Sequence, residues 1–192
     1  MRYPAEHKEA VRARIITQAA KALRKDGLDG VSIPAIMKKV GLTHGGFYVH
    51  FEDRDALVAA AIEAAATSTG ATVLSPAQGG AAAMFGAYLH PEHVEHPEVG
   101  CVLAALGSEG RRAGPRVRRA FAWAARGFVR LVDRQLHPGA AADDDEAAPA
   151  DAALARSAAM IGAVVLARLV DDPDLAARVL EATRRAALDG AR

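Results

Sequence analysis

The stretch GLTHGGFYVHF, residues 41–51, places two adjacent glycines in a segment whose neighbouring residues have the pattern of a helix. Each glycine costs a helix interior about 1 kcal/mol relative to alanine. The aromatic residues Phe47 and Phe51 suit a short helix with Thr43 as its N-cap better than they suit a loop. The two glycines therefore indicate that another molecule comes very close to the backbone of this helix.

Two further helical patterns precede this stretch. Residues 10–27, AVRARIITQAAKALRKDG, carry an apolar stripe at helical spacing and stop at Gly27, a favourable residue just after the end of a helix. Residues 31–41, VSIPAIMKKVG, predict a short second helix with Ser32 as N-cap and a proline in its first turn, where proline is tolerated. We therefore expect one long and one short helix before the segment with the two glycines.

Two short helices separated by the residues GLT, 41–43, have the pattern of a helix-turn-helix, in which the second helix enters the major groove of DNA. Gly45 and Gly46 fall in the first turn of that recognition helix, where missing side chains let backbone N–H groups approach phosphates and bases. A phosphate-binding P-loop is the competing interpretation, but it requires a preceding strand and a Gly-Lys-Ser/Thr ending, which the sequence lacks. The pattern favours DNA binding.

The remainder of the chain also has helical periodicity and gives no strand signal. Asp53 is the expected N-cap of a long fourth helix, and further helices follow beyond residue 68, the last of them interrupted at Pro173. Residues 137–150, HPGAAADDDEAAPA, predict an acidic link of low complexity. We therefore expect an all-α protein with about nine helices.

Composition restricts the class of protein. A chain of 192 residues that is 51% hydrophobic and 24% charged is typical of a globular protein and excludes a disordered one. Cys101 is the only cysteine, so no intrachain disulfide can form, and residues 1–15 lack the apolar core of a signal peptide. The longest apolar run, residues 158–170, is too short to span a bilayer and contains Arg168. A cytoplasmic location is expected.

The net charge of +1 conceals an asymmetry between the two ends of the chain. Residues 1–54 contain ten Lys or Arg and six Asp or Glu, a net charge of +4, so that the rest of the chain has −3. His7, His44 and His50 lie in the same segment and can add positive charge near an anion. A basic segment suits a polyanion such as DNA, although a solvated helix face produces the same excess.

The segments RARIITQAAKALRKDG, residues 12–27, and SIPAIMKKVGLTHGGFYVHFEDRDAL, residues 32–57, together resemble the N-terminal DNA-binding domain of the TetR/AcrR family of transcriptional regulators. The resemblance is dense over residues 8–68. The matching positions are Arg14, Ile15, Gly27, Ser32, Ile36, Gly41, Thr43, Gly45, Tyr48, His50, Phe51, Arg54 and Leu57. Met37 and Arg54 replace an alanine and a lysine that many members have, and neither change threatens the fold.

The resemblance implies DNA contacts residue by residue. Phosphate contacts are implied for Ser32, Thr43, Tyr48, His50 and Arg54, and base contacts for His44, Gly45 and Gly46. The chemistry agrees, because hydroxyls, a phenol and a cation are phosphate donors and an imidazole can donate to or accept from a base edge. Tyr48 and His50 can alternatively serve in part as packing residues. Phe47 and Phe51 are expected in the core.

The resemblance also implies a second domain, residues 69–192, after a DNA-binding domain of residues 8–68. In the family this second part binds a small molecule among its central helices and dimerises through its last two long helices, here about residues 151–170 and 174–188. The implied function is a homodimeric regulator without a cofactor, a repressor that leaves its palindromic operator when a small-molecule effector binds. Activation instead of repression is an open alternative. Close packing at the dimer interface, or in a monomer core, would suit the small residues Ala158, Ala159, Gly162 and Ala163.

Aromatic and sulfur-containing residues of the second domain are candidates for a ligand pocket, although at helical spacing such residues are more commonly ordinary core. They are Phe85, Tyr88, Cys101, Phe121, Trp123, Phe128 and Met160. Cys101 follows Gly100 at an expected helix start, where the helix dipole and nearby histidines would favour a reactive thiolate. A buried, unreactive thiol is the alternative.

Metal and enzyme chemistry are weaker interpretations. Residues 90–97 contain three histidines, but two prolines interrupt the helix that would align their imidazoles, so we expect a polar loop and no metal site. The only candidate catalytic pair is Cys101 as nucleophile with one of these histidines as base, and the sequence shows no oxyanion donor beside them. A protein without catalytic activity is expected, and a helical interaction module that does not bind DNA is the remaining rival.

Overall fold

The computed structural model describes residues 5–74, 79–138 and 148–189, which form helices joined by short connections, with no strand among them. The α-helices are α1 (Ala5–Asp26), α2 (Ile33–Lys39), α3 (Arg54–Thr69), α4 (Gly80–Tyr88), α5 (Pro91–Glu95), α6 (Val102–Gly110), α7 (Pro115–Leu136), α8 (Asp151–Leu169) and α9 (Pro173–Asp189). Three short elements join them, the 3-10 helices η1 (His44–Val49) and η3 (Pro97–Val99) and the π-helical turn η2 (Gly70–Leu74). The all-α fold class is confirmed.

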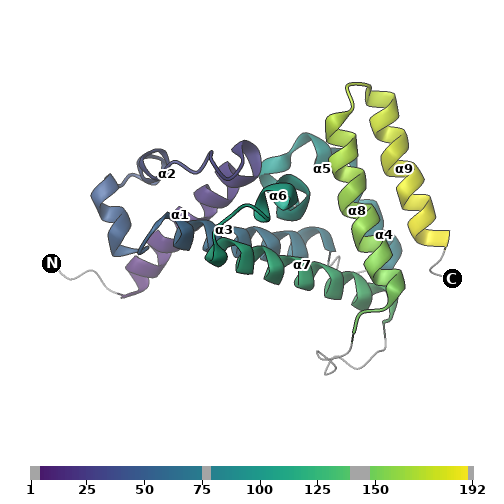
Figure 1. Ribbon diagram of the computed structural model, residues 1–192, viewed down its shortest axis with the longest axis horizontal. Helices are drawn as coiled ribbons and strands as arrows, with labels where there is room; N and C mark the ends of the chain where they lie inside the picture. The colour runs from purple at the N-terminus through teal and green to yellow at the C-terminus, as the bar shows by residue number, and fades with distance from the viewer. Residues whose placement is uncertain (1–4, 75–78, 139–147, 190–192) are drawn as a thin grey trace.

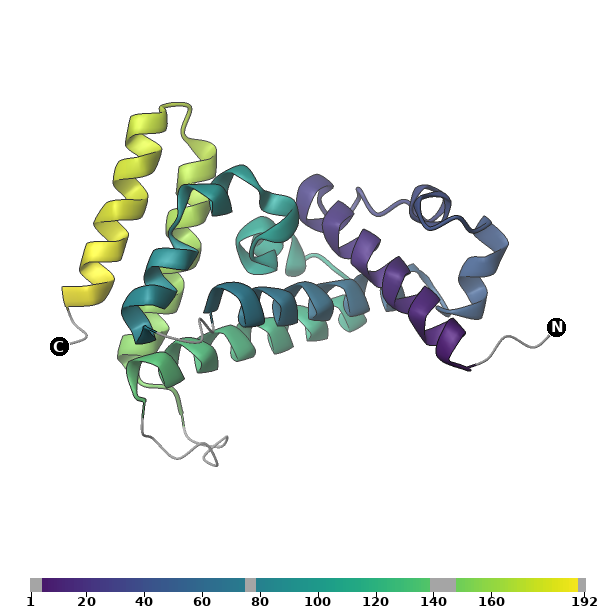
Figure 2. The ribbon, with the colours of Figure 1, turned by 180° about the vertical axis from the view of Figure 1, so that it is seen from behind.

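The helices are arranged between two ends of an elongated molecule. Helices α1 and α2 lie at one end, and α8 and α9 form a pair at the other (Figure 1). Helices α3 and α7 pack alongside each other and run between the two ends, as the view from behind also shows (Figure 2). A change in the position of α7 would therefore affect both ends of the molecule.

Buried apolar residues form two clusters. The first joins α1, α2, η1 and α3 to α6 and the first half of α7, with Ile15 and Phe47 fully buried in it. The second joins α4, the second half of α7, α8 and α9 around Tyr88 and Met160. Helices α6 and α7 of the predicted second domain thus complete the core of the first, and the predicted boundary at residue 68 stays a prediction.

The helix ends follow the signals expected from the sequence. The Ser32 hydroxyl accepts from the backbone N–H of Ala35 at 3.5 Å, and Asp53 Oδ1 accepts from that of Ala56 at 2.6 Å, so both residues act as N-caps. Gly27 follows α1 with a φ of 82°, a left-handed conformation that favours glycine. The end of α1 and the starts of α2 and α3 are therefore set by local sequence.

The prediction of a polar loop at residues 90–97 is wrong in part. Pro91 begins α5 instead of breaking a helix, because a proline at the first helical position has no N–H to lose. His90 precedes it as N-cap, and its Nδ1 accepts from the backbone N–H of Glu92 at 3.3 Å. Residues 139–147 of the predicted acidic link lie outside the described residues.

Two described stretches, Arg54–Leu74 and Asp151–Leu169, are long and apolar enough to cross a membrane by length and composition alone. The second is longer than the run of residues 158–170 on which the sequence-based expectation rested. Half of the apolar window in the first stretch and a third of that in the second are buried inside the protein. Core helices of soluble proteins pass the same test, so these stretches are weak evidence for a membrane protein.

Candidate DNA-binding surface and effector cavity

A tight turn joins α2 to the glycine-containing helix η1. Gly41 adopts a φ of 78°, and the backbone N–H of Leu42 donates to the carbonyl of Met37 at 2.9 Å. Phe47 anchors η1 in the core, with its ring stacked on that of Phe51 at a centroid distance of 5.6 Å. This anchor fixes which face of η1 is directed away from the protein.

The outward face of η1 carries the predicted DNA-contacting residues. His44 and Gly45 are exposed, and the Tyr48 side chain is 63% exposed. The Tyr48 hydroxyl makes no hydrogen bond within the described residues, although its ring packs edge-on against Phe47. Val49, for which the sequence carries no functional signal, is 60% exposed and extends the same surface. An exposed phenol and imidazole on a short helix form a surface that suits a DNA groove.

The two glycines are not required by the protein's own structure. Neither Gly45 nor Gly46 has a positive φ. A Cβ at Gly45 would meet no atom within 4 Å, and one at Gly46 would make only ordinary contacts, at 3.7 Å from Met37 and 3.8 Å from Thr43. Because the fold tolerates side chains here, the glycines are better explained by a molecule that approaches from outside.

The recognition helix differs from the prediction in its type and its cap. It is a 3-10 helix, in which the backbone N–H of Gly46 donates to the carbonyl of Thr43 at 3.1 Å. A capping Thr43 hydroxyl would accept from this same backbone N–H of Gly46. The N–H is already used, and the Thr43 side chain makes no capping bond. Its exposed hydroxyl therefore has no capping role that competes with a contact to DNA.

Arg54 is directed differently from the other predicted phosphate ligands. Its Nε donates to the carbonyl of Val31 at 3.3 Å, and its Nη2 donates to the carbonyl of Leu28. The guanidinium therefore holds the connection between α1 and α2 against the start of α3. This geometry favours a structural role for Arg54 over the phosphate contact that the family resemblance implied.

This difference predicts opposite behaviour for two variants. Arg54→Ala should lower the free energy of unfolding by about 1–3 kcal/mol, because partly buried carbonyls lose a charged donor. Tyr48→Phe should leave thermal stability unchanged and weaken binding to all DNA sequences by several-fold, because only a phosphate donor is lost. Thermal melting and fluorescence anisotropy with labelled DNA would measure both effects. If the Tyr48→Phe protein bound DNA as tightly as the wild type, Tyr48 would not be a DNA contact.

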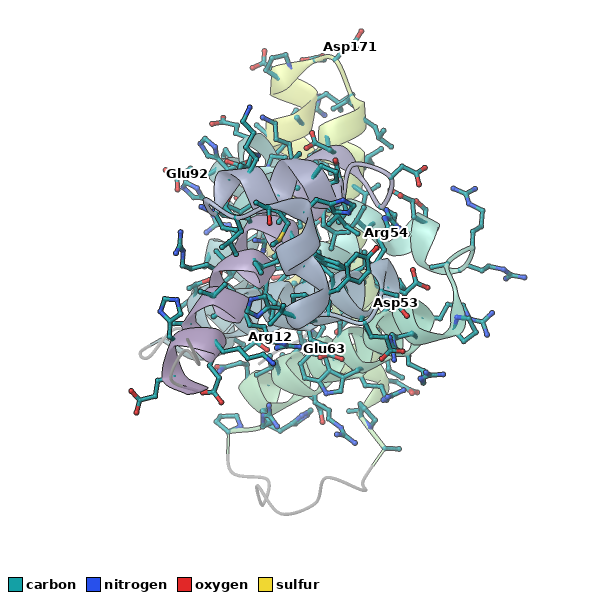
Figure 3. The ribbon with its side chains drawn as sticks, turned by 90° about the vertical axis from the view of Figure 1, so that its left-hand side faces the viewer. Arg12, Asp53, Arg54, Glu63, Glu92 and Asp171 are labelled. Carbon is teal, nitrogen blue, oxygen red and sulfur yellow. The ribbon has the colours of Figure 1, made fainter. Side chains whose placement is uncertain are left out.

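The basic N-terminal part of α1 borders the recognition helix, as the end-on view of this region shows (Figure 3). Arg12 lies over the Phe51 ring at 4.8 Å from its centroid. Partial burial, with the charges of Lys8 and Arg12, lowers the pKa of His50 below its ordinary value. In the free protein His50 is therefore less readily protonated than an ordinary histidine. Lys8 and Arg12 supply positive charge to this surface.

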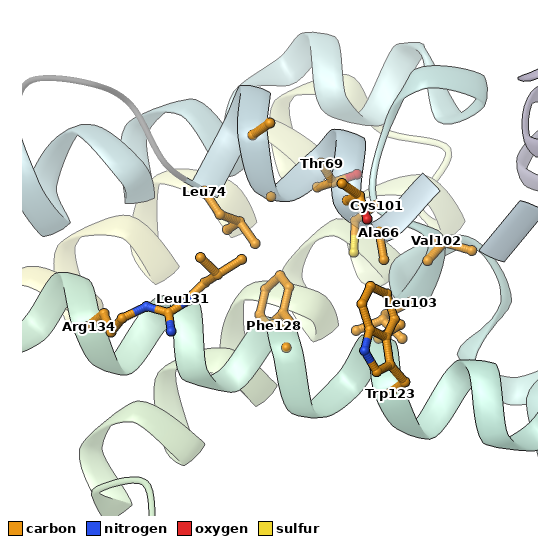
Figure 4. A pocket seen from close by; sticks show the side chains of 15 residues that line it. Ala66, Thr69, Leu74, Cys101, Val102, Leu103, Trp123, Phe128, Leu131 and Arg134 are labelled. Atoms are coloured by element: carbon orange, nitrogen blue, oxygen red, sulfur yellow. The ribbon is translucent and has the colours of Figure 1, made fainter. Parts of the chain in front are cut away.

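A cavity of about 390 Å³ lies between the end of α3 with its π-helical turn, the start of α6 and the middle of α7 (Figure 4). Its wall is formed by Ala66, Thr67, Thr69, Gly70, Ala71, Leu74, Cys101, Val102, Leu103, Trp123, Ala124, Gly127, Phe128, Leu131 and Arg134. Of the seven predicted pocket residues, Cys101, Trp123 and Phe128 line this cavity. A concave, mostly apolar site of this size is the usual form of a small-molecule site.

The other four predicted pocket residues are core residues away from the cavity wall. Phe85, Tyr88 and Met160 are fully buried in the second cluster, where the Tyr88 ring packs edge-on against Phe128 at 5.4 Å. Phe121 belongs to the first cluster and packs against Gly110, where an added Cβ would come within 2.8 Å of its ring. They do not line this cavity, and their burial agrees with the alternative interpretation, in which they are packing residues.

The sequence-based case for a reactive thiolate at Cys101 is contradicted by its surroundings. The side chain is 2% exposed, and burial raises the pKa of the thiol above its ordinary value. His93 Nε2 accepts from the backbone N–H of Cys101 at 2.8 Å, and its Nδ1 donates to the carbonyl of Tyr88 at 2.7 Å. This neutral imidazole cannot supply the cation that would favour a thiolate.

The three histidines of residues 90–96 do not converge on a common point. His93 is buried, and both its ring nitrogens are used by backbone groups. His90 and His96 are exposed and lie 3.9 Å from Glu92 and 3.6 Å from Glu98, respectively. Within the part of the chain that the structure describes, no group of three metal-ligating side chains is arranged around a common site.

The fold and its short exposed helix after a turn define a helix-turn-helix DNA-binding regulator. Residues 15–61 match the profile of the family described as bacterial regulatory proteins, tetR family. No curated protein sequence is significantly similar to the chain.

Solved structures cover nearly the whole chain. A TetR transcriptional regulator from Chloroflexus aurantiacus J-10-fl is 25% identical, with a TM-score of 0.72 over 96% of this chain and 95% of that one. A TetR-family regulator from Cytophaga hutchinsonii is 19% identical, with a TM-score of 0.75 over 98% of each chain. The reduced form of NemR from E. coli is 18% identical, with a TM-score of 0.71 over 94% of this chain and 96% of that one. Residues 15–61 thus belong to the tetR family of bacterial regulatory proteins, and the whole chain has the fold of TetR-family transcriptional regulators.

Proposed function

We propose that the protein is a homodimeric repressor, located in the cytoplasm, that leaves a palindromic operator when a small molecule enters the cavity. The observation that carries this proposal is the position of the cavity, whose walls are helices that also contact the DNA-binding end. Residues 8–68 would bind DNA, and residues 69–192 would bind the effector and form the dimer. Catalysis has no part in this function.

The proposed DNA contacts follow from exposure and chemistry. His44, Gly45 and Gly46 would face base edges, because they begin the outward face of η1. Ser32, Thr43, Tyr48 and His50 would contact phosphates as neutral donors, and Lys8 and Arg12 would add charge from α1. Arg54 would support the surface without touching DNA.

A hydrogen-bonded junction connects the cavity wall to the DNA-binding end. The carbonyl of Gly100, next to the cavity residue Cys101, accepts from Arg24 Nη1 at 3.0 Å and from the Thr69 hydroxyl at 3.2 Å. Arg24 is in the last turn of α1, and Thr69 lines the cavity. A ligand that displaces Thr69 or the start of α6 would therefore shift α1.

A second connection runs through α7. Arg116, at the start of this helix, lies 3.3 Å from Glu52 and 3.2 Å from Asp53, the two residues between the recognition segment and α3. The same helix forms one wall of the cavity from Trp123 to Arg134. Movement of α7 would change the direction of the recognition helices, which must fit major grooves about 34–36 Å apart in a symmetric dimer.

Helix α8 offers the surface for dimerisation. Its mean hydropathy is 1.6, yet only a third of its apolar window is buried. The residues that share one exposed, apolar face at helical spacing are Ala155, Ala158, Ala159, Gly162, Leu166 and Leu169. A Cβ at Gly162 would meet no atom within 4 Å, so this face has room for a closely packed helix of a second copy.

Selection of bound fragments from a random DNA pool would test the proposal. We expect enrichment of an inverted repeat whose half-sites are separated by one helical turn, because a two-fold dimer presents two equal recognition helices. Binding should weaken steeply as salt increases. Failure to enrich any sequence would contradict DNA recognition, and a single asymmetric half-site would contradict the symmetric dimer. The effect of operator binding on transcription of a reporter would separate repression from activation.

A further inference from the structure

We propose that the effector is an elongated, apolar molecule with one anionic end, typified by a long-chain monocarboxylate, whose charge binds Arg134. This inference rests on the proposed function of the cavity as the effector site and specifies the class of molecule that it takes. It follows from three features of the cavity, which are the chemistry of its wall, its length and an arginine at one end that pairs with no other described residue.

The wall offers almost no polar group to a ligand. Side chains such as Leu74, Leu103, Phe128 and Leu131 form most of it. The protons of the two threonine hydroxyls are already used, because Thr67 donates to the carbonyl of Glu63 at 2.9 Å and Thr69 shares its single proton between the carbonyls of Ala65 and Gly100. A ligand body with many hydrogen-bonding groups would lose their hydration without replacement, so an apolar body is favoured.

Arg134 is the exception. Among the described residues that line the cavity it is the only charged one, and its guanidinium makes no hydrogen bond or ion pair with any other described residue. Two further arginines, Arg126 and Arg130, precede it at four-residue intervals on α7 but do not line the cavity. An arginine presents paired N–H donors that match a carboxylate, so an anionic group is the complementary end of the ligand.

The spacing of residues on α7 sets the length of the ligand. Trp123 and Arg134 lie toward opposite ends of the cavity (Figure 4). They are separated by eleven residues of one helix, which corresponds to about 16 Å at 1.5 Å per residue. A compact ligand would not reach from the arginine to the indole, whereas an extended chain would.

Gly127 shows that the middle of this wall is kept open. It lies within α7, where glycine costs about 1 kcal/mol of helix stability relative to alanine. Gly127 shares roughly the same 40° sector of the helix with Trp123 and Arg134. An added Cβ would meet no atom within 4 Å, so the fold does not require a glycine here. A larger side chain at this position would occupy the space between the two ends of the cavity.

Trp123 allows direct measurement of binding without DNA, because it is the only tryptophan in the chain. The probes are dodecanoate, dodecanol and dodecyltrimethylammonium, which share one hydrocarbon chain and differ in the charge of the head, each used below its micelle concentration. We expect saturable changes in Trp123 emission with dodecanoate, with an affinity at least about tenfold higher than that of the other two probes. Equal affinity for dodecanoate and dodecanol, or no saturable binding of dodecanoate, would overturn the proposal.

Three variants identify the site. Arg134→Gln should lower dodecanoate affinity about tenfold and leave dodecanol binding unchanged, whereas Arg126→Gln removes the same charge from outside the cavity wall and should change neither. Gly127→Leu should abolish binding of every probe while helix content and melting temperature stay the same or rise. Unchanged dodecanoate binding in either Arg134→Gln or Gly127→Leu would place the ligand elsewhere and overturn the proposal.

A separate assay distinguishes this inference from the proposed function. Dodecanoate should release labelled operator DNA from the wild type, and the Gly127→Leu protein should bind the operator and resist release. If dodecanoate binds the cavity through Arg134 but leaves the DNA complex intact, ligand-induced release is wrong and the ligand class stands. If another molecule releases DNA through the cavity while dodecanoate does not bind, the ligand class is wrong and the function stands.

Discussion

Gly46→Leu should abolish operator binding while the protein remains folded. A Cβ at Gly46 meets its neighbours only at ordinary van der Waals distances, and its φ is not positive, so a side chain can start here without backbone strain. In the complex, the added side chain would separate η1 from the groove and disturb base and phosphate contacts worth about 1–3 kcal/mol each. We expect affinity to fall at least 100-fold, about 2.7 kcal/mol, in a fluorescence anisotropy titration.

The matched control is Gly107→Leu, which makes the same substitution at an exposed position of α6 where an added Cβ also meets no atom within 4 Å. That protein should bind the operator normally. Gly41→Ala should show the reverse pattern, because a φ of 78° strains any side chain, so stability falls before DNA affinity does. If the Gly46→Leu protein unfolds, the glycine has a structural role. If it binds the operator as tightly as the wild type does, the glycine is not needed for the approach of DNA.

The helix-turn-helix could be predicted from sequence because its signals are local. Ser32 and Asp53 cap their helices with their own side chains, and Gly27 and Gly41 adopt the left-handed conformation that their positions imply. Each of these signals involves residues only a few positions apart. The direction of Arg54 could not be predicted in this way, because its partners are carbonyls at residues 28 and 31, more than twenty positions away.

The proposed effector cavity was harder to predict, because the absence of large side chains creates it. Small residues such as Ala66, Gly70, Ala71 and Gly127 create the space, and nothing in their chemistry distinguishes them from the other small residues of the chain. Aromatic residues at helical spacing can line a pocket or fill a core, and the sequence does not distinguish the two. Phe85 and its neighbours fill the core. Arg134 carries no distinguishing sequence signal, because arginine is common on exposed helix faces.

Leu169→Glu should convert the dimer into a monomer. Leu169 is 76% exposed at the end of the apolar face of α8, next to Leu166 on the same face. In a two-fold dimer the substitution would bury an unpaired carboxylate in each protomer, which costs roughly 3–5 kcal/mol per site. The dissociation constant of the dimer should rise more than about 100-fold, which size-exclusion chromatography with light scattering would detect as a halving of the mass.

Val99→Glu is the matched control, because Val99 is also an exposed apolar residue but lies in η3 and not on the apolar face of α8. This variant should remain dimeric. Loss of the dimer in Leu169→Glu should also weaken operator binding, since each protomer alone contacts one half-site and loses the advantage of a linked second contact. A wild-type monomer, or a Leu169→Glu protein that stays dimeric, would show that the exposed apolar face of α8 has another role. A monomeric variant that still binds the full operator tightly would instead separate dimerisation from DNA recognition.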